Sequence, residues 1–244
     1  GGVDYVRSRN SLEVYKDTDY DLKSGEGGVR YAPGTGIEVD LVYRATSGEY
    51  KSAQRYGDDG SALLCNNNCR KNDYDEDSLQ ARIQYRPSED SSLGGFVGYT
   101  RRDYDQGNRH FRGLTTGFDT EWAVSGAVQM RASLGRSIEP DDDAVTGSYA
   151  DTWSLNFSPT IQATGKITVE PYLRLYDRRY KGDQLAAGQV ERKDKIYMVG
   201  AEADYEFRRN MFLMASISRE QRDSNRANLD YKANVFGLGL KVQF

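Results

Sequence analysis

Residues 231–244 read YKANVFGLGLKVQF, and this stretch decides the fold class of the chain. Large apolar side chains stand at every second position, and small or polar ones fill the positions between them. The apolar set is Phe236, Leu238, Leu240, Val242 and Phe244. A period of two is typical of a β-strand whose two faces meet different environments. The stretch therefore predicts a strand with one apolar and one polar face, ending at an aromatic residue.

The same period recurs upstream in segments of about ten residues. It is clearest at residues 167–180, where Ile167, Val169, Leu173 and Leu175 alternate with charged residues and tyrosines. The other predicted strands lie near residues 3–12, 20–32, 37–44, 79–86, 93–102, 114–122, 128–134, 153–158, 196–207 and 211–222. Together with residues 231–244 they make about twelve strands, in the even-numbered manner of antiparallel membrane barrels.

Composition removes several classes of protein. The chain has 244 residues, 33 basic and 37 acidic, and this balance offers no basic surface for a nucleic acid. Its mean hydropathy is −0.77, and it contains no run of about 20 apolar residues, so helical membrane spans are excluded. A membrane-spanning barrel remains allowed, because its strands show lipid only every second residue. The 18 Tyr, 25 Gly and 5 Pro suit strands and tight turns.

The connections between the predicted strands alternate in length. Short ones stand at residues 33–36, 88–91, 124–126 and 208–210, and longer polar ones at 47–75, 139–147, 180–193 and 223–228. Outer-membrane barrels have short periplasmic turns and longer outer loops. The alternation therefore predicts an up-and-down barrel in a bacterial outer membrane, with Phe244 at the periplasmic end.

The polar face of the strands carries so many long charged side chains that we expect it to line a lumen, with the apolar face toward lipid. A soluble barrel with the opposite orientation is the alternative, because a period of two cannot tell inside from outside. The candidate lumen residues are Arg82, Arg86, Arg102, Asp119, Glu121, Arg131, Glu170, Tyr172, Arg174, Tyr176 and Arg178.

Two interpretations apply to Arg102, Asp119, Glu121 and Arg131, which we place on neighbouring strands. They can form a mixed-charge constriction for sugar hydroxyls or uronic-acid carboxylates, since arginine binds carboxylates through two hydrogen bonds. The favoured interpretation is a ladder of cross-strand ion pairs that holds the wall.

Tyr172, Tyr176 and Tyr180 are spaced by four on one face. They can form a track on which sugar rings stack, or they can be strand residues at the membrane interface.

Few residues suggest other chemistry. Cys65 and Cys69 lie in a polar stretch and predict a small disulfide in an oxidising compartment; a metal site would need more ligands than a chain with one histidine offers. His110 lies near Asp103 and Asp105, but no serine stands out as a nucleophile, so no enzyme is predicted. The acidic run at residues 141–143 is expected to be solvated. No cofactor motif is present, and none is expected.

Residues 98–104, 108–114 and 119–122 read GYTRRDY, NRHFRGL and DTEW. They resemble a family of β-barrel porins encoded with bacterial exopolysaccharide operons. The resemblance is strongest over residues 80–135, and the terminal Phe244 is shared by most outer-membrane barrels. Members of that family tend to be longer, so the chain, predicted as a single domain over residues 1–244, can be the C-terminal part of a longer barrel.

The resemblance implies passive export of an exopolysaccharide through a hydrated lumen that binds weakly enough to release. The expected partners are outer-membrane lipid, the polysaccharide and periplasmic export components, with no nucleic acid; the oligomeric state stays open. The first alternative is a structural or interaction barrel plugged by its own side chains. The second is an outer-membrane hydrolase using His110.

Overall fold

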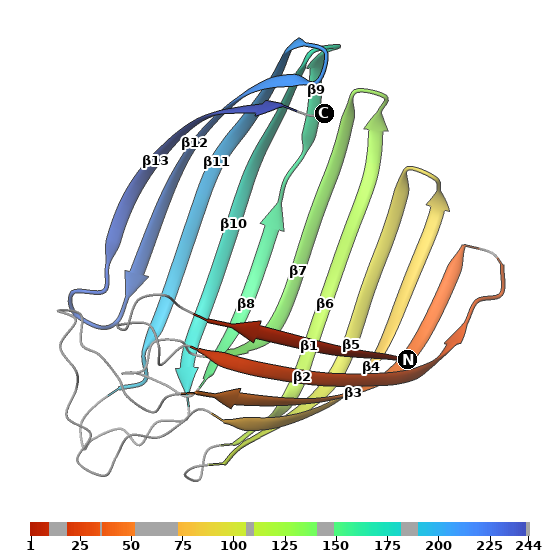
Figure 1. The fold of residues 1–244 in the computed structure, drawn as a ribbon, viewed down its shortest axis with the longest axis vertical. Coiled ribbons are helices and arrows are strands. Elements are labelled where there is room, and N and C mark those ends of the chain that lie inside the picture. Colours follow the sequence, from red (N-terminus) through yellow and green to blue (C-terminus); the bar gives the residue numbers. More distant parts are fainter. Residues whose placement is uncertain are drawn as a thin grey trace.

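The computed structural model describes residues 1–9, 19–34, 36–51, 73–105, 110–140, 149–181 and 190–242. These residues form one antiparallel β-sheet (Figure 1). They contain no helix that is long and apolar enough to cross a membrane. The strands are β1 Gly2–Ser8, β2 Tyr20–Tyr31, β3 Ile37–Tyr50, β4 Tyr74–Ser88, β5 Ser91–Tyr104, β6 His110–Ser125, β7 Val128–Pro140, β8 Tyr149–Phe157, β9 Thr160–Thr164, β10 Ile167–Lys181, β11 Lys193–Arg208, β12 Met211–Ser224 and β13 Tyr231–Val242.

Each strand pairs with its neighbours in sequence, from β1 to β13. The exceptions are β8 and β9, which both lie between β7 and β10 and form two segments of one crossing (Figure 1). The 13 strands therefore make about twelve crossings, which confirms the predicted up-and-down antiparallel topology. Within the described ranges β1 and β13 are the two edges of the sheet and do not pair with each other.

Two prolines explain the break between β8 and β9. Phe157 pairs with Leu173 on β10, and Ile161 pairs with Val169. This shared register sets Pro159 opposite Pro171. Neither residue has a backbone N–H to donate to a ladder, so the pairing lapses there and resumes beyond.

The connections alternate in length around the sheet, as predicted. At one end, here called the turn end, they have two to five residues and lie along the upper and right-hand edge of Figure 1. At the opposite end, the loop end, they have five to 23 residues. Neither β9 nor the two-residue turn at Gly165–Lys166, which joins β9 to β10, was predicted.

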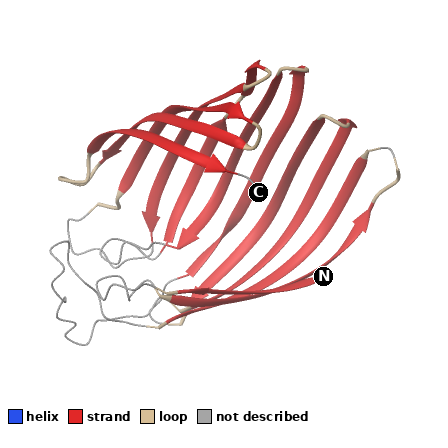
Figure 2. Cartoon of the chain, turned by 45° about the horizontal axis from the view of Figure 1, so that its top comes forward, coloured by secondary structure: helices blue, strands red, loops and turns tan. Residues whose placement is uncertain are grey.

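The sheet is strongly curved, like an open cylinder (Figure 2), and its two faces differ in chemistry. Adjacent residues of β4 show this: Ser78 is 5% exposed, whereas Leu79 is 51% exposed. Side chains on a concave face crowd one another, so the polar face is the concave one. Leu41, Val97 and Leu155 are likewise exposed on the convex face. An apolar outside and a polar inside are the arrangement of a membrane barrel, which confirms the predicted fold class.

Aromatic residues gather on the convex face close to the turn end. Tyr31, Tyr85, Trp122 and Tyr205 all lie within about three residues of a turn and are exposed. Tyrosine and tryptophan favour the interface between lipid and water, because their rings are apolar and their N–H or O–H groups are polar. We therefore expect this row to mark one edge of the membrane.

Both tryptophans of the chain, Trp122 and Trp153, lie exposed on the convex face. In lipid vesicles, brominated phospholipids should quench most of their emission, whereas aqueous iodide should quench little, because the indoles contact acyl chains rather than water. The measurement is steady-state fluorescence of the folded protein, with single-tryptophan variants Trp122→Phe and Trp153→Phe to separate the two signals. Emission quenched by iodide but untouched by bromolipid would show that the convex face meets water, as in a soluble barrel.

Candidate functional site: the inner wall

The concave, polar face of the sheet is here called the inner wall. The register of the strands places all the predicted lumen side chains on it. These are Arg82, Arg86, Arg102, Asp119, Glu121, Arg131, Glu170, Tyr172, Arg174, Tyr176 and Arg178. Their common face follows from alternation along each strand, since residues two apart point the same way.

The inner wall does not bring Arg102 together with Asp119, Glu121 and Arg131. Arg102 stands opposite Phe111 near the loop end, whereas Asp119 lies eight residues further along β6. At about 3.3 Å per residue this separates the two levels by about 26 Å. The expected four-residue constriction is therefore wrong in its grouping: the residues share a face but stand at different depths.

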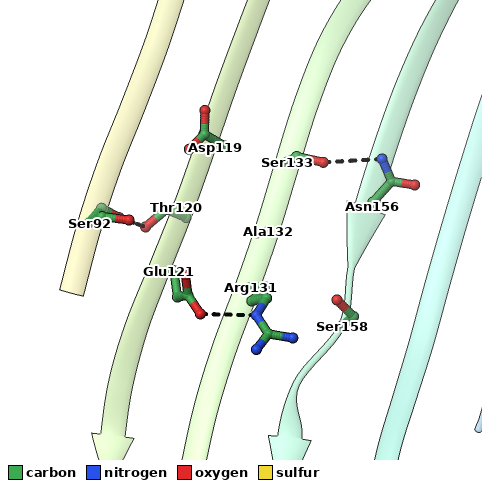
Figure 3. Close-up of a pocket in the computed structure, with 9 residues that line it drawn as sticks. All are labelled: Ser92, Asp119, Thr120, Glu121, Arg131, Ala132, Ser133, Asn156 and Ser158. Atoms are coloured by element: carbon green, nitrogen blue, oxygen red, sulfur yellow. Dashed lines mark hydrogen bonds and ion pairs between the residues drawn. The ribbon is translucent and has the colours of Figure 1, made fainter. Parts of the chain in front are cut away.

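Near the turn end, an open groove of about 320 Å³ is lined by residues of β5, β6, β7 and β8 and by Ser158, which follows β8 (Figure 3). Arg131 donates to Glu121 at 3.0 Å across the β6–β7 pair, and the Asn156 amide donates to Ser133 at 3.1 Å. Glu121 and Arg131 are thus neutralised by each other. The groove presents hydroxyl, amide and carboxylate groups rather than a single sign of charge.

Other charged side chains of the inner wall are also paired across strands. Arg44 contacts Glu26 at 2.6 Å, and Arg86 contacts Glu38 at 2.8 Å. Arg82 instead donates to Gln80 on its own strand, at 2.8 Å. Such pairs fix neighbouring strands in register at little cost where water reaches them.

A second arrangement was not foreseen: arginines stack on tyrosine rings. The guanidinium carbon of Arg102 lies 4.3 Å from the ring centre of Tyr74, and that of Arg174 lies 4.6 Å from the ring centre of Tyr172. The same contact joins Arg178 to Tyr176 at 5.5 Å, Arg192 to Tyr180 at 4.2 Å and Arg222 to Tyr231 at 4.9 Å. These are cation–π contacts, in which the ring face attracts the cation.

The sequence did hold a signal for two of these stacks. Tyr172 and Arg174, like Tyr176 and Arg178, are two apart and so stand side by side on one face of a strand. In the other three stacks the two residues are far apart in the sequence, or one of them lies in a loop. These stacks become visible only once the strand register is known.

Carboxylates complete the stacks near the loop end. Arg102, which is 4% exposed, is bound by Glu76 at 2.5 Å. Arg192 binds Asp194 at 2.7 Å, and Asp194 also accepts a hydrogen bond from Ser224 at 2.7 Å. Burial makes these charge-assisted contacts stronger than those at an open surface. Strand alternation alone did not predict these roles of Glu76, Asp194 and Arg192.

Aromatic rings pack together at the loop end of the sheet. Tyr50, Tyr74, Tyr104, Phe111 and Tyr149 form a buried cluster, called here the aromatic cluster. The rings of Tyr74 and Tyr104 lie 5.8 Å apart, and those of Phe111 and Tyr149 lie 5.3 Å apart in an edge-on arrangement. Rings at such separations attract one another, so the cluster should hold its shape.

A glycine makes room for one ring on the inner wall. A Cβ atom at Gly200 would stand 2.6 Å from the Tyr172 ring and 2.7 Å from the Ile217 carbonyl oxygen. Gly200 pairs directly with Tyr172 on the neighbouring strand. The missing side chain therefore makes the space in which the Tyr172 ring rests against β11.

A cluster of ion pairs lies on the convex face of the sheet, close to the loop end. Asp21 of β2 is contacted by Arg9 at 2.5 Å, by Lys51 at 2.6 Å and by Arg7 at 3.3 Å. The hydrogen bond to Asp21 raises the pKa of Lys51, which stays charged at neutral pH.

His110 begins β6, exposed on the outer face and opposite Asp103. Asp103 is itself paired with Arg101 at 2.5 Å. The part of the chain that the structure describes contains no group of His, Cys, Asp and Glu that could hold a metal ion. Several predicted features lie outside the described residues. They are Cys65 and Cys69, residues 106–109, the acidic run at residues 141–143, and Phe244.

Comparison with known proteins agrees with this architecture. Among solved structures, the chain is similar to the copper transporter OprC (TM-score 0.60, 10% identity, 92% of this chain and 41% of that one). It is also similar to the FrpB iron transporter of Neisseria meningitidis (TM-score 0.57, 11% identity, 93% and 41%). A third is the alcaligin outer-membrane receptor FauA of Bordetella pertussis (TM-score 0.55, 15% identity, 90% and 42%). At these identities the likeness concerns the fold alone.

The chain spans about two fifths of the length of these solved proteins, at 41% of OprC and 42% of FauA. No curated protein matches it. A protein family described as "Putative beta-barrel porin 2" matches residues 91–244, which is most of the chain and includes β5 to β13. The sheet with its polar inner wall thus belongs to a member of this family of outer-membrane β-barrel porins.

Proposed function

We propose that the protein is a channel through which an exopolysaccharide leaves the periplasm passively. The observation that carries this proposal is the contrast between the two faces of the sheet. The convex face suits lipid, while the inner wall offers paired charges, hydroxyl groups and aromatic rings. Sugars are bound by this combination, because their hydroxyl groups need hydrogen bonds and their C–H faces stack on rings.

The proposed orientation places the turn end in the periplasm and the loop end outside. Short turns at one end and long connections at the other support it, as does the usual asymmetry of outer-membrane barrels. Val242, the last described residue, then lies on the periplasmic side. Transport through such a wall needs no chemical step, so we propose no enzymatic role for the chain, and His110 serves as an ordinary surface residue.

The aromatic cluster supports a second candidate function, a barrel whose interior is largely filled and whose role is structural. Its five rings are buried at the loop end, and the register places four of them, Tyr50, Tyr74, Tyr104 and Phe111, on the concave face. Planar-bilayer recording separates the two functions. A channel should give discrete current steps, and Tyr104→Ala with Phe111→Ala should raise the step size about twofold or more, since removing two rings widens the path.

Leu114→Ala on the convex face is the matched control, because it removes an apolar side chain that faces away from the lumen. It should leave the step size unchanged. If neither the native protein nor the double variant gives steps, although both are folded by circular dichroism, the channel proposal fails in favour of the filled barrel.

A further inference from the structure

We propose that Arg174, held by Tyr172 and accompanied by Asn156, is a binding subsite for the carboxylate of an acidic sugar. The inference rests on the proposed export function and narrows its cargo to a polymer that contains uronic acid. We call Asn156, Tyr172, Arg174 and Tyr176 the Arg174 subsite. All four belong to the inner wall, on β8 and β10.

Stacking fixes Arg174 without using its hydrogen-bond donors. Its guanidinium carbon lies 4.6 Å from the ring centre of Tyr172, whose own ring rests against Gly200. A cation–π contact attracts the charge of the guanidinium and supplies no hydrogen-bond acceptor to its N–H groups, which lie in the guanidinium plane. The arginine is therefore oriented, and its donors remain available to a planar anion.

Two of the related stacks show which group these donors bind. Arg102 on Tyr74 is met by Glu76, and Arg192 on Tyr180 is met by Asp194, in each case a carboxylate of the protein. Arg174 is exposed, and within the described residues no carboxylate or other hydrogen-bond acceptor contacts it. Arg174 and Tyr172 thus repeat this arrangement of ring and cation without the carboxylate. We infer that the substrate supplies this carboxylate.

The strand register explains why no protein carboxylate reaches Arg174. Its direct neighbours are Asn156 on β8 and Met198 on β11. Glu220 lies one strand beyond Met198 and accepts a hydrogen bond from Tyr231. Glu170 is four residues away along β10, about 13 Å at the usual rise, and accepts from Thr160.

The chemistry around Arg174 favours a carboxylated sugar. A single arginine fork matches the two oxygens of a carboxylate, whereas phosphate sites usually combine several cations or backbone N–H groups. Polar groups for sugar hydroxyls stand beside it: the Tyr176 hydroxyl lies 3.5 Å from the Asn156 oxygen, and the Asn156 amide bonds Ser133. The subsite is open to the lumen, so we expect weak binding compatible with release.

The test uses oligogalacturonate of about six sugars as the probe and maltohexaose as the neutral control. In bilayers, oligogalacturonate should block the native channel at a concentration at least about tenfold below that of maltohexaose. Arg174→Gln should remove about a tenfold preference, the worth of one charge-assisted pair. Arg174→Lys should restore the preference only in part, because lysine cannot form the fork.

Arg44→Gln is the matched control, since it removes an inner-wall charge that Glu26 already binds. It should keep the preference for oligogalacturonate. Calorimetric titration of the same proteins in detergent measures binding even if no current flows, so failure of the channel proposal is distinguished from failure of the subsite. Equal affinity for both oligosaccharides, or equal loss in the Arg174→Gln and Arg44→Gln variants, would overturn the subsite. Tighter binding of a sulfated than of a carboxylated oligosaccharide would overturn the carboxylate assignment.

Discussion

Replacing Ile217 with arginine should lower the free energy of unfolding by about 2–4 kcal/mol, the cost of a charge near the middle of the membrane on a lipid-facing strand. Ile217 is 53% exposed on the convex face at the centre of β12, between Ala201 and Phe236. Its side chain has no polar partner there, and an arginine would have to reach the headgroups at the expense of lipid packing.

Ser218→Arg is the matched control, one residue along the same strand but on the inner wall. An arginine there meets water and lies near Glu220, so the expected change is within about 0.5 kcal/mol. The measurement is urea unfolding of both variants in phosphatidylcholine vesicles, followed by tryptophan emission. Equal destabilisation by the two substitutions, or a larger effect at Ser218, would contradict the assignment of the faces.

Replacing Glu76 with glutamine should destabilise the barrel by about 3 kcal/mol, because it leaves the guanidinium of a buried arginine without its carboxylate. Arg102 is 4% exposed, and Glu76 binds it at 2.5 Å through one terminal nitrogen and at 2.7 Å through Nε. The Tyr74 ring, which also contacts the guanidinium, cannot replace a negative charge.

A double-mutant cycle tests this pair. Arg102→Met together with Glu76→Gln should recover part of the loss, because the uncompensated charge is removed along with its partner. The same urea titration gives the four free energies. Arg131→Gln, which breaks the more exposed contact with Glu121, should cost less than about 1 kcal/mol. A Glu76→Gln cost as small as that would show that water reaches Arg102 freely.

Alternation along the chain was enough to predict the strands other than β9, and the faces of their residues. In β10, Leu173 and Leu175 were expected outside and Arg174 and Tyr176 inside, and the register places them so. Such predictions succeed because the face of a strand residue depends only on whether its number is odd or even. The short turns could also be predicted from the sequence, apart from the one at residues 165–166.

Depth and partnership could not be predicted in the same way. They depend on how far each strand is shifted against the next, which alternation does not specify. Arg102 was grouped with Glu121 and Arg131 for this reason, whereas its partner is Glu76, 26 residues earlier. The Arg174 subsite likewise needs Gly200 opposite Tyr172, a coincidence of register between β10 and β11.

The facing prolines, Pro159 and Pro171, give the wall a mechanical property. The backbone hydrogen bonds between the two strands are interrupted there. The register is nevertheless the same on both sides, where Phe157 pairs with Leu173 and Ile161 pairs with Val169. The two strands can thus separate locally at the prolines without a change in their pairing register. We expect this point, one residue from Tyr172, to be the most easily deformed part of the sheet. The inner wall beside the Arg174 subsite would then adjust to a transported polysaccharide whose width varies along its length.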